Sequence, residues 1–159
     1  MGPDPAPRRP RGAGRSGFRA RRTAHEITVH RPDAALTVGA PYEVAPDIAA
    51  DALDEWLELV EWARRTGAGA WAADPYGPGR GIQLHATDAE PALNAEWLVE
   101  TGEQGVSRRR GHEKAAAASR GPLTSVLPAF HRRLPLDTPG LEVMGERGTL
   151  ESRLEKSAF

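Results

Sequence analysis

The sequence contains no cysteine, so a disulfide, a thiolate metal ligand and a cysteine nucleophile are all excluded for this chain. It also lacks any apolar run close to the ~20 residues that a membrane-spanning helix needs. Its N-terminus has no apolar central stretch of the kind found in secretory signal peptides. With 159 residues, 39% hydrophobic and 27% charged, the composition is typical of one globular domain, or of a small domain with an extra piece. We therefore expect a cytoplasmic protein without a membrane partner.

Basic residues are unevenly distributed, although the net charge of the chain is only −1. Residues 1–22 hold seven arginines and one aspartate, and the remainder is acidic. The tail at 1–17 is rich in Pro, Gly and Arg and has no apolar side chain larger than Met1, which predicts disorder. Its arginines could attract nucleic acid, but no aromatic side chain precedes Phe18 for base stacking. A solvated tail is the favoured interpretation, and nucleic-acid binding is the lowest-ranked alternative.

Hydrophobic periodicity predicts an α+β protein in which helices pack on an antiparallel sheet. We expect helices over 18–31, 48–65, 122–130 and 148–157, and strands over 81–87, 96–102, 105–111 and, with poorer strand propensity, 114–121. Pro32 should end the first helix, because the residue before a proline is disfavoured in the α conformation. Asp47 is a good N-cap for the second helix, and Pro128 should kink or shorten the third.

Side chains on these elements carry further predictions. Trp56, Trp62 and Trp97 are expected in the core rather than at a ligand. The arginines at 108–110 are expected on an edge strand, where basic residues block pairing with another chain. His85 lies on the polar phase of its strand, which favours a solvent-facing or hydrogen-bonded histidine over a catalytic one.

The segment RRTAHEITVHRPDA, residues 21–34, is the main candidate for a metal site. His25 and His30 are five residues apart, about 140° from facing each other on a helix, so the HExxH pattern of metalloproteases does not apply. Glu26 and His30 are four apart and share one face, and both are ligand types that zinc accepts. Without a third ligand nearby in sequence, spacing alone favours a surface ion pair over a metal site.

The same segment resembles the signature R-x-x-x-H-E-x-x-x-H-R-W-D-A of the mycothiol-dependent maleylpyruvate isomerase family. Five downstream segments resemble, in the same order, the C-terminal domain of that family: GIQLHATD, EWLVE, KAAAASRGP, RLPLD and LEVMGERGTLESRL. The resemblance covers roughly residues 21–155. It implies the last helix of a DinB-like metal-binding bundle at 18–34, followed by a sterol-carrier-like α/β domain at 35–159.

The resemblance also implies a chemistry. Glu26 and His30 would be two ligands of a divalent metal, usually zinc, and mycothiol would be the thiol cofactor. Its thiolate would add to an unsaturated diacid so that the double bond can rotate, and Arg133, which precedes LPLD, would contact a substrate carboxylate. In the family a histidine from an early bundle helix supplies the third metal ligand, and none of the other histidines of this sequence matches it.

The early bundle helices have no counterpart before Arg21, and Pro32 replaces the tryptophan of the signature. We therefore expect an N-terminally truncated member, active as an isomerase or transferase only if a partner chain supplies the missing helices. Its first helix should then expose an apolar stripe that includes Ala20, Ala24 and Ile27. The alternative is a non-catalytic small-ligand-binding or regulatory domain of the sterol-carrier type, with an apolar pocket in the region 81–159. The sequence leaves open whether this chain is an enzyme.

Overall fold

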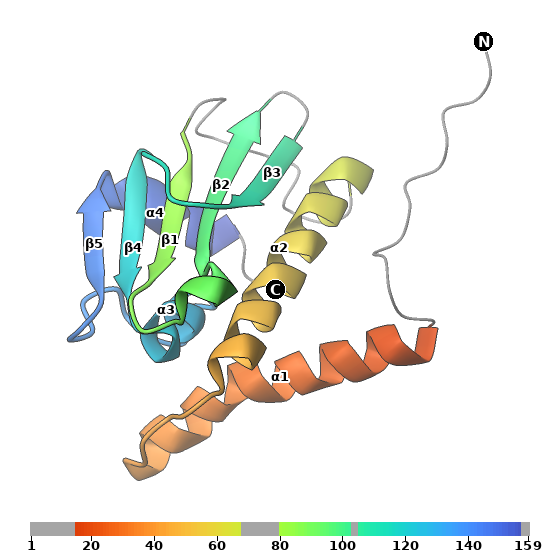
Figure 1. The fold of residues 1–159 in the computed structure, drawn as a ribbon, viewed down its shortest axis with the longest axis vertical. Helices are drawn as coiled ribbons and strands as arrows, with labels where there is room; N and C mark the ends of the chain where they lie inside the picture. Colours follow the sequence, from red (N-terminus) through yellow and green to blue (C-terminus); the bar gives the residue numbers. More distant parts are fainter. Residues whose placement is uncertain (1–14, 68–79, 103–104, 157–159) are drawn as a thin grey trace.

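The α+β class predicted from the sequence is confirmed. The computed structural model describes residues 15–67, 80–102 and 105–156 (Figure 1). The elements are α1 (Arg15–Val38), α2 (Pro46–Thr66), β1 (Ile82–Ala86), a 3₁₀ turn (Pro91–Leu93), β2 (Glu96–Gly102), β3 (Gly105–Arg110), β4 (Ala117–Gly121), α3 (Leu123–Phe130), β5 (Glu142–Gly145) and α4 (Arg147–Lys156). Among the helices described, none is both long and apolar enough to span a membrane.

The five strands form one mixed sheet in the order β3-β2-β1-β4-β5. The predicted antiparallel pairing of β2 with β3 is confirmed, and β1–β2 and β4–β5 are antiparallel too. The prediction of a wholly antiparallel sheet is wrong, because β1 pairs with β4 in parallel. The parallel pair arises because the β2–β3 hairpin and the segment after it return the chain to the other side of β1. The prediction that Arg108–Arg110 lie on an edge strand is confirmed, since β3 ends the sheet. The short, largely exposed strand β5 was not predicted.

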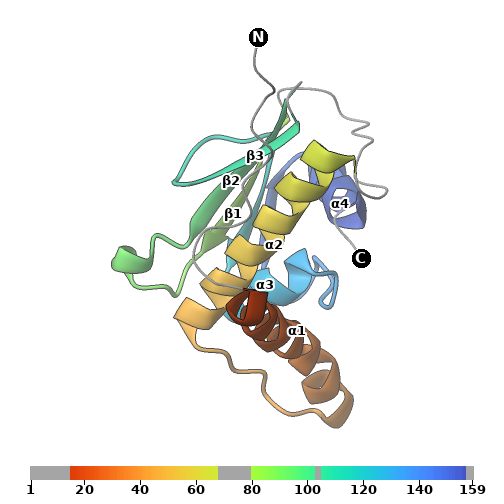
Figure 2. The same cartoon turned by 90° about the vertical axis from the view of Figure 1, so that its right-hand side faces the viewer.

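Helices α2, α3 and α4 cover one face of the sheet, and no described helix covers the other (Figure 2). Alternation along the strands decides which side chains lie on each face. Ile82, Leu84 and Trp97 point to the helices and join the buried core with residues such as Leu53 and Leu127. The side chains of opposite parity lie on the uncovered face of the sheet.

The first helix is longer than predicted. It continues through Pro32 to Val38 and so extends past residue 34, the predicted end of the bundle-helix segment. A proline has no N–H, so the carbonyl of Thr28, four residues earlier, loses its helical partner. The Tyr42 hydroxyl donates to that carbonyl oxygen at 3.1 Å, which replaces the missing bond. The helix ends instead at Gly39, whose φ of +66° is the left-handed conformation common after helix C-termini.

Two predictions about α2 are wrong and one about α1 is confirmed. The N-cap of α2 is Ala45 with Pro46 in the first turn, so Asp47 lies inside the helix rather than capping it. Trp62 is 45% exposed, whereas Trp56 and Trp97 are buried as predicted. Ile27 is 59% exposed on α1, in line with the unpaired apolar stripe expected there.

The predicted disorder of the tail at 1–17 concerns residues 1–14, which lie outside the described residues, whereas residues 15–17 are helical and begin α1. The third helix, Leu123–Phe130, continues through Pro128 and covers nearly all of the predicted range 122–130, so Pro128 does not shorten it.

Candidate functional site

Glu26 and His30 lie together on the outer side of α1, as their spacing predicts. Glu26 Oε2 is 3.3 Å from His30 Nε2, and both side chains are about half exposed. Arg22, one turn earlier on the helix, also pairs with Glu26. Two metal-ligand types therefore meet at an accessible position.

Asp33 and Arg133 complete the surroundings of His30. Asp33 Oδ2 is 3.4 Å from His30 Nδ1, the ring nitrogen that does not face Glu26. Arg133, one hundred residues later in the chain, donates to the same Asp33 oxygen at 2.8 Å. The structure thus brings all three site residues predicted from the sequence, Glu26, His30 and Arg133, into one chain of contacts through Asp33.

His25 faces the opposite way and joins α1 to α2. Its Nδ1 is 2.7 Å from Glu55 Oε2 and its Nε2 is 3.0 Å from Asp51 Oδ2. Arg21 also pairs with Asp51, and this hydrogen bond lowers the pKa of the Asp51 carboxyl below its usual value. Because both ring nitrogens of His25 are engaged by α2, His25 cannot serve as a ligand beside Glu26 and His30.

His131 lies behind this region, at the end of α3. Its ring meets Trp56 edge-on, with ring centroids 4.6 Å apart, and its buried Nε2 has no hydrogen-bond partner among the described residues. Burial lowers the pKa of His131 to about 3, and the nearby charges of Arg22, Arg133, His30 and His25 act in the same direction. The folded protein therefore holds His131 neutral.

The neutral state of His131 predicts acid-sensitive stability. Its pKa is about 3 in the folded protein and about 6.5 in the unfolded chain, so only the unfolded chain takes up this proton between those values. His131 therefore leaves the free energy of unfolding unchanged above pH 6.5. Below that pH it lowers the free energy of unfolding by ~1.4 kcal/mol per pH unit, which is a loss of about 2 kcal/mol at pH 5.

Urea unfolding of wild type and of His131→Phe at pH 7.5 and pH 5 measures this loss. The phenylalanine keeps a ring against Trp56, and the variant should gain about 2 kcal/mol relative to wild type at the lower pH. An unchanged difference between the two proteins would contradict the assignment.

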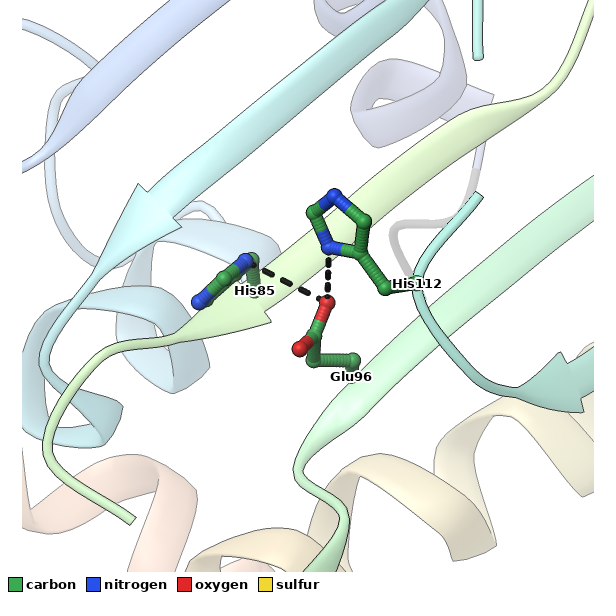
Figure 3. A group of neighbouring side chains, drawn as sticks. All are labelled: His85, Glu96 and His112. Carbon is green, nitrogen blue, oxygen red and sulfur yellow. Dashed lines mark hydrogen bonds and ion pairs between the residues drawn. The ribbon is translucent and has the colours of Figure 1, made fainter. Parts of the chain in front are cut away.

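A second group of ligand-type side chains lies on the uncovered face of the sheet (Figure 3). His85 in β1 is directly opposite Glu96 in β2 in the antiparallel register, so both side chains point to that face. His112 follows β3 and turns back over β2. Glu96 Oε2 is 3.2 Å from His85 Nδ1 and 2.5 Å from His112 Nδ1. Each of the three residues offers a ligand atom within 4.8 Å of the other two, so the group could hold a metal ion.

Backbone and side-chain contacts hold this group, hereafter the sheet-face triad (His85, Glu96 and His112), in place. Gly111 has a φ of +146°, a conformation that favours glycine, and its N–H donates to the Glu96 carbonyl at 3.1 Å. Gln83 is buried two residues before His85, and its Nε2 donates to the Gly111 carbonyl at 2.8 Å and lies 3.4 Å from Glu96 Oε2. Gln83 therefore contacts both the turn that carries His112 and the carboxylate itself.

The sequence did not predict the sheet-face triad. It predicted only that His85 would be solvent-facing or hydrogen-bonded. Its polar strand position is correct, and it does contact a carboxylate. The strand alternation also places Glu96 on a polar phase, but the sequence does not reveal the register that sets it opposite His85. His112 lies in a connection whose path depends on Gly111 and Gln83.

The chain matches no protein-family model, no curated protein and no solved structure.

An open depression of about 480 Å³ lies beside α1, outside the region 81–159 where an apolar pocket was predicted. It is lined by Thr28, Arg31, Glu43, Val44, Ala45 and Ile48. The two groups of ligand-type residues on α1 and on the sheet are therefore the candidate sites.

Proposed function

We propose that this chain is a divalent-metal protein of the mycothiol-dependent maleylpyruvate isomerase type, in which Glu26 and His30 bind the metal. The observation that carries the proposal is the surroundings of His30. Its Nε2 faces Glu26, while its Nδ1 faces Asp33. A carboxylate on the second ring nitrogen of a histidine orients the ring for a metal and raises its basicity.

Arg133 gives the proposal its second support. It reaches Asp33 from the segment after α3, so a cationic group from the C-terminal part stands beside the two candidate ligands on α1. A guanidinium is suited to bind a carboxylate in two-point fashion. Arg133 would therefore hold the unsaturated dicarboxylate substrate next to the metal.

Glu26 and His30 fit two positions of a zinc site, and the described residues place no third ligand beside them. We propose that a partner chain supplies the third ligand. Zinc would lower the pKa of a bound mycothiol thiol, which is the chemistry the family resemblance implies. In this chain, Asp33 orients His30, and Arg133 positions the substrate.

Zinc binding at α1 must be measured without the sheet-face triad, which could hold zinc as well. In a His112→Ala background, we expect a weak residual zinc site that Glu26→Ala and His30→Ala both abolish. Asp33→Asn should weaken the same site by ~10–100-fold, as loss of an outer-shell partner does. Isothermal titration with Zn²⁺, with far-UV circular dichroism to confirm folding, measures these affinities.

The exposed Glu43 provides the matched control, because Glu43→Ala removes a carboxylate near α1 that does not face His30. Zinc affinity that is equal in all variants would show that α1 holds no metal, and the proposal would be wrong. Arg133→Ala should keep zinc binding but weaken binding of maleate to the zinc-loaded chain by ~10-fold or more.

A further inference from the structure

The sheet-face triad contains an arrangement that hydrogen bonds alone account for poorly. One oxygen, Glu96 Oε2, faces three groups: His85 Nδ1 at 3.2 Å, His112 Nδ1 at 2.5 Å and Gln83 Nε2 at 3.4 Å. A carboxylate oxygen has about two lone-pair sites. Both imidazoles would also need their hydrogen on Nδ1 to donate to it. Two rings and an amide therefore converge on an oxygen that cannot serve all three well.

A cation accounts for the same geometry more simply. We propose that His85, Glu96 and His112 bind a divalent ion of the zinc class on the uncovered face of the sheet. With Zn–N and Zn–O distances of ~2.0–2.1 Å and tetrahedral angles, ligand atoms lie about 3.3 Å apart. The His85–Glu96 separation of 3.2 Å already has this value, and all three ligand atoms lie within 4.8 Å of each other. Binding requires the close His112–Glu96 contact to open by somewhat less than 1 Å, and the two histidine nitrogens, which lie within 4.8 Å of each other, to settle near the same ~3.3 Å spacing.

The chemistry of the three donors selects the ion. Two imidazoles and one carboxylate suit zinc and its transition-metal neighbours, whereas magnesium and calcium prefer sets made of oxygens alone. The His85 and His112 rings are nearly perpendicular, with an angle of 89° and centroids 5.5 Å apart. Two ligands on different elements can thus approach one ion from different directions without stacking.

The structure assigns a positioning role to Gln83. Its buried amide donates to the Gly111 carbonyl and lies against Glu96, so it fixes both the turn before His112 and the ligand carboxylate. Its Oε1 is buried and has no hydrogen-bond partner among the described residues. A buried polar side chain with one unsatisfied atom is costly to the fold, which argues that Gln83 serves the site rather than packing alone.

The proposed site has three protein ligands and lies on a face that no described helix covers (Figure 2). His112 is mostly exposed, and His85 and Glu96 are partly exposed. Closed structural zinc sites use four protein ligands, whereas sites with three leave a position for water or a small ligand. The geometry therefore points to an accessible ion with a water ligand. This inference does not depend on the function proposed for α1.

The test is a titration of the full chain, stripped of metal, with Zn²⁺ and with Co²⁺ as a spectroscopic probe. We expect one tight zinc site per chain, and a visible cobalt spectrum of the four-coordinate type. His85→Ala and His112→Ala should each weaken zinc binding by more than the ~10–100-fold that loss of an outer-shell partner costs. Gln83→Leu should weaken it by ~10-fold, with the native circular dichroism spectrum retained.

Glu43→Ala is the matched control, since it removes an exposed carboxylate near α1 that belongs to neither proposed metal group. This variant should leave the tight site unchanged. Absence of tight zinc binding in wild type, or wild-type affinity in both His85→Ala and His112→Ala, would overturn the proposal. Because His112 is largely exposed, its loss should not unfold the chain, so the result stays interpretable. Loss of zinc only in the α1 variants would instead favour the function proposed above.

Discussion

Replacing Trp97 by alanine is expected to lower the free energy of unfolding by about 3–5 kcal/mol, the range for loss of a large buried aromatic side chain. Trp97, the second residue of β2, is 0% exposed and packs toward α2. Its Nε1 donates to Asp54 Oδ1 at 2.9 Å, and the guanidinium of Arg110 lies 4.4 Å from the ring centroid. The substitution thus opens a cavity, removes the hydrogen bond that joins β2 to α2, and removes the ring on which Arg110 of β3 rests. Urea unfolding followed by far-UV circular dichroism measures the loss.

Trp62→Ala is the control, because it makes the same change at an exposed tryptophan. Trp62 is 45% exposed on α2, so its removal should change stability by ~1 kcal/mol or less. Similar losses for the two tryptophans would show that Trp97 does not hold the sheet to α2 as described. Trp97→Phe should recover part of the loss, because it refills most of the volume but cannot donate to Asp54.

His25→Ala is expected to cost about 3–5 kcal/mol, because it leaves a buried charge without its closest partner. Glu55 is 1% exposed, and its Oε2 is 2.7 Å from His25 Nδ1. Arg22 remains near the same oxygen at 3.5 Å, while Glu55 Oε1 has no hydrogen-bond partner among the described residues. The loss should appear as a lower urea midpoint.

The double variant His25→Ala/Glu55→Ala separates the interaction energy of the His25–Glu55 pair from the cost of burying Glu55 without a partner. Once His25 is alanine, the further change Glu55→Ala should cost much less than it does in wild type, with a coupling energy of ~1–3 kcal/mol. His30→Ala, five residues along the same helix, removes a half-exposed histidine and should change stability by about 0.5 kcal/mol. Equal effects of the two histidine variants would contradict the docking role assigned to His25.

The two proposed metal groups make zinc content alone an ambiguous measurement. One zinc per chain could reside at Glu26 and His30 or at the sheet-face triad. The variants therefore have to be compared in pairs, His30→Ala against His112→Ala, so that each group serves as the control for the other. The resulting pattern distinguishes a metal on α1, a metal on the sheet, both, or neither.

Local periodicity determined much of this protein without reference to its tertiary structure. The α+β class, the long amphipathic helix around Leu53, the β2–β3 hairpin and the shared face of Glu26 and His30 all depend on residues close together in sequence. Repeats of 3.6 and 2 residues encode such features directly. The same local rules failed at Pro32, because the partner that replaces its missing hydrogen bond, Tyr42, lies ten residues further along the chain.

Tertiary structure decided where those faces meet. The pairing of β1 with both β2 and β4 sets His85 opposite Glu96, and Gly111 with Gln83 then brings His112 over the same oxygen. Likewise, Arg133 reaches Asp33 only because α3 packs beside α1. Strand register and helix docking depend on the whole core, since the same alternating pattern fits several pairings equally well. The sequence therefore determined which residue types were available for a site, and the packing of the core determined which of them came together.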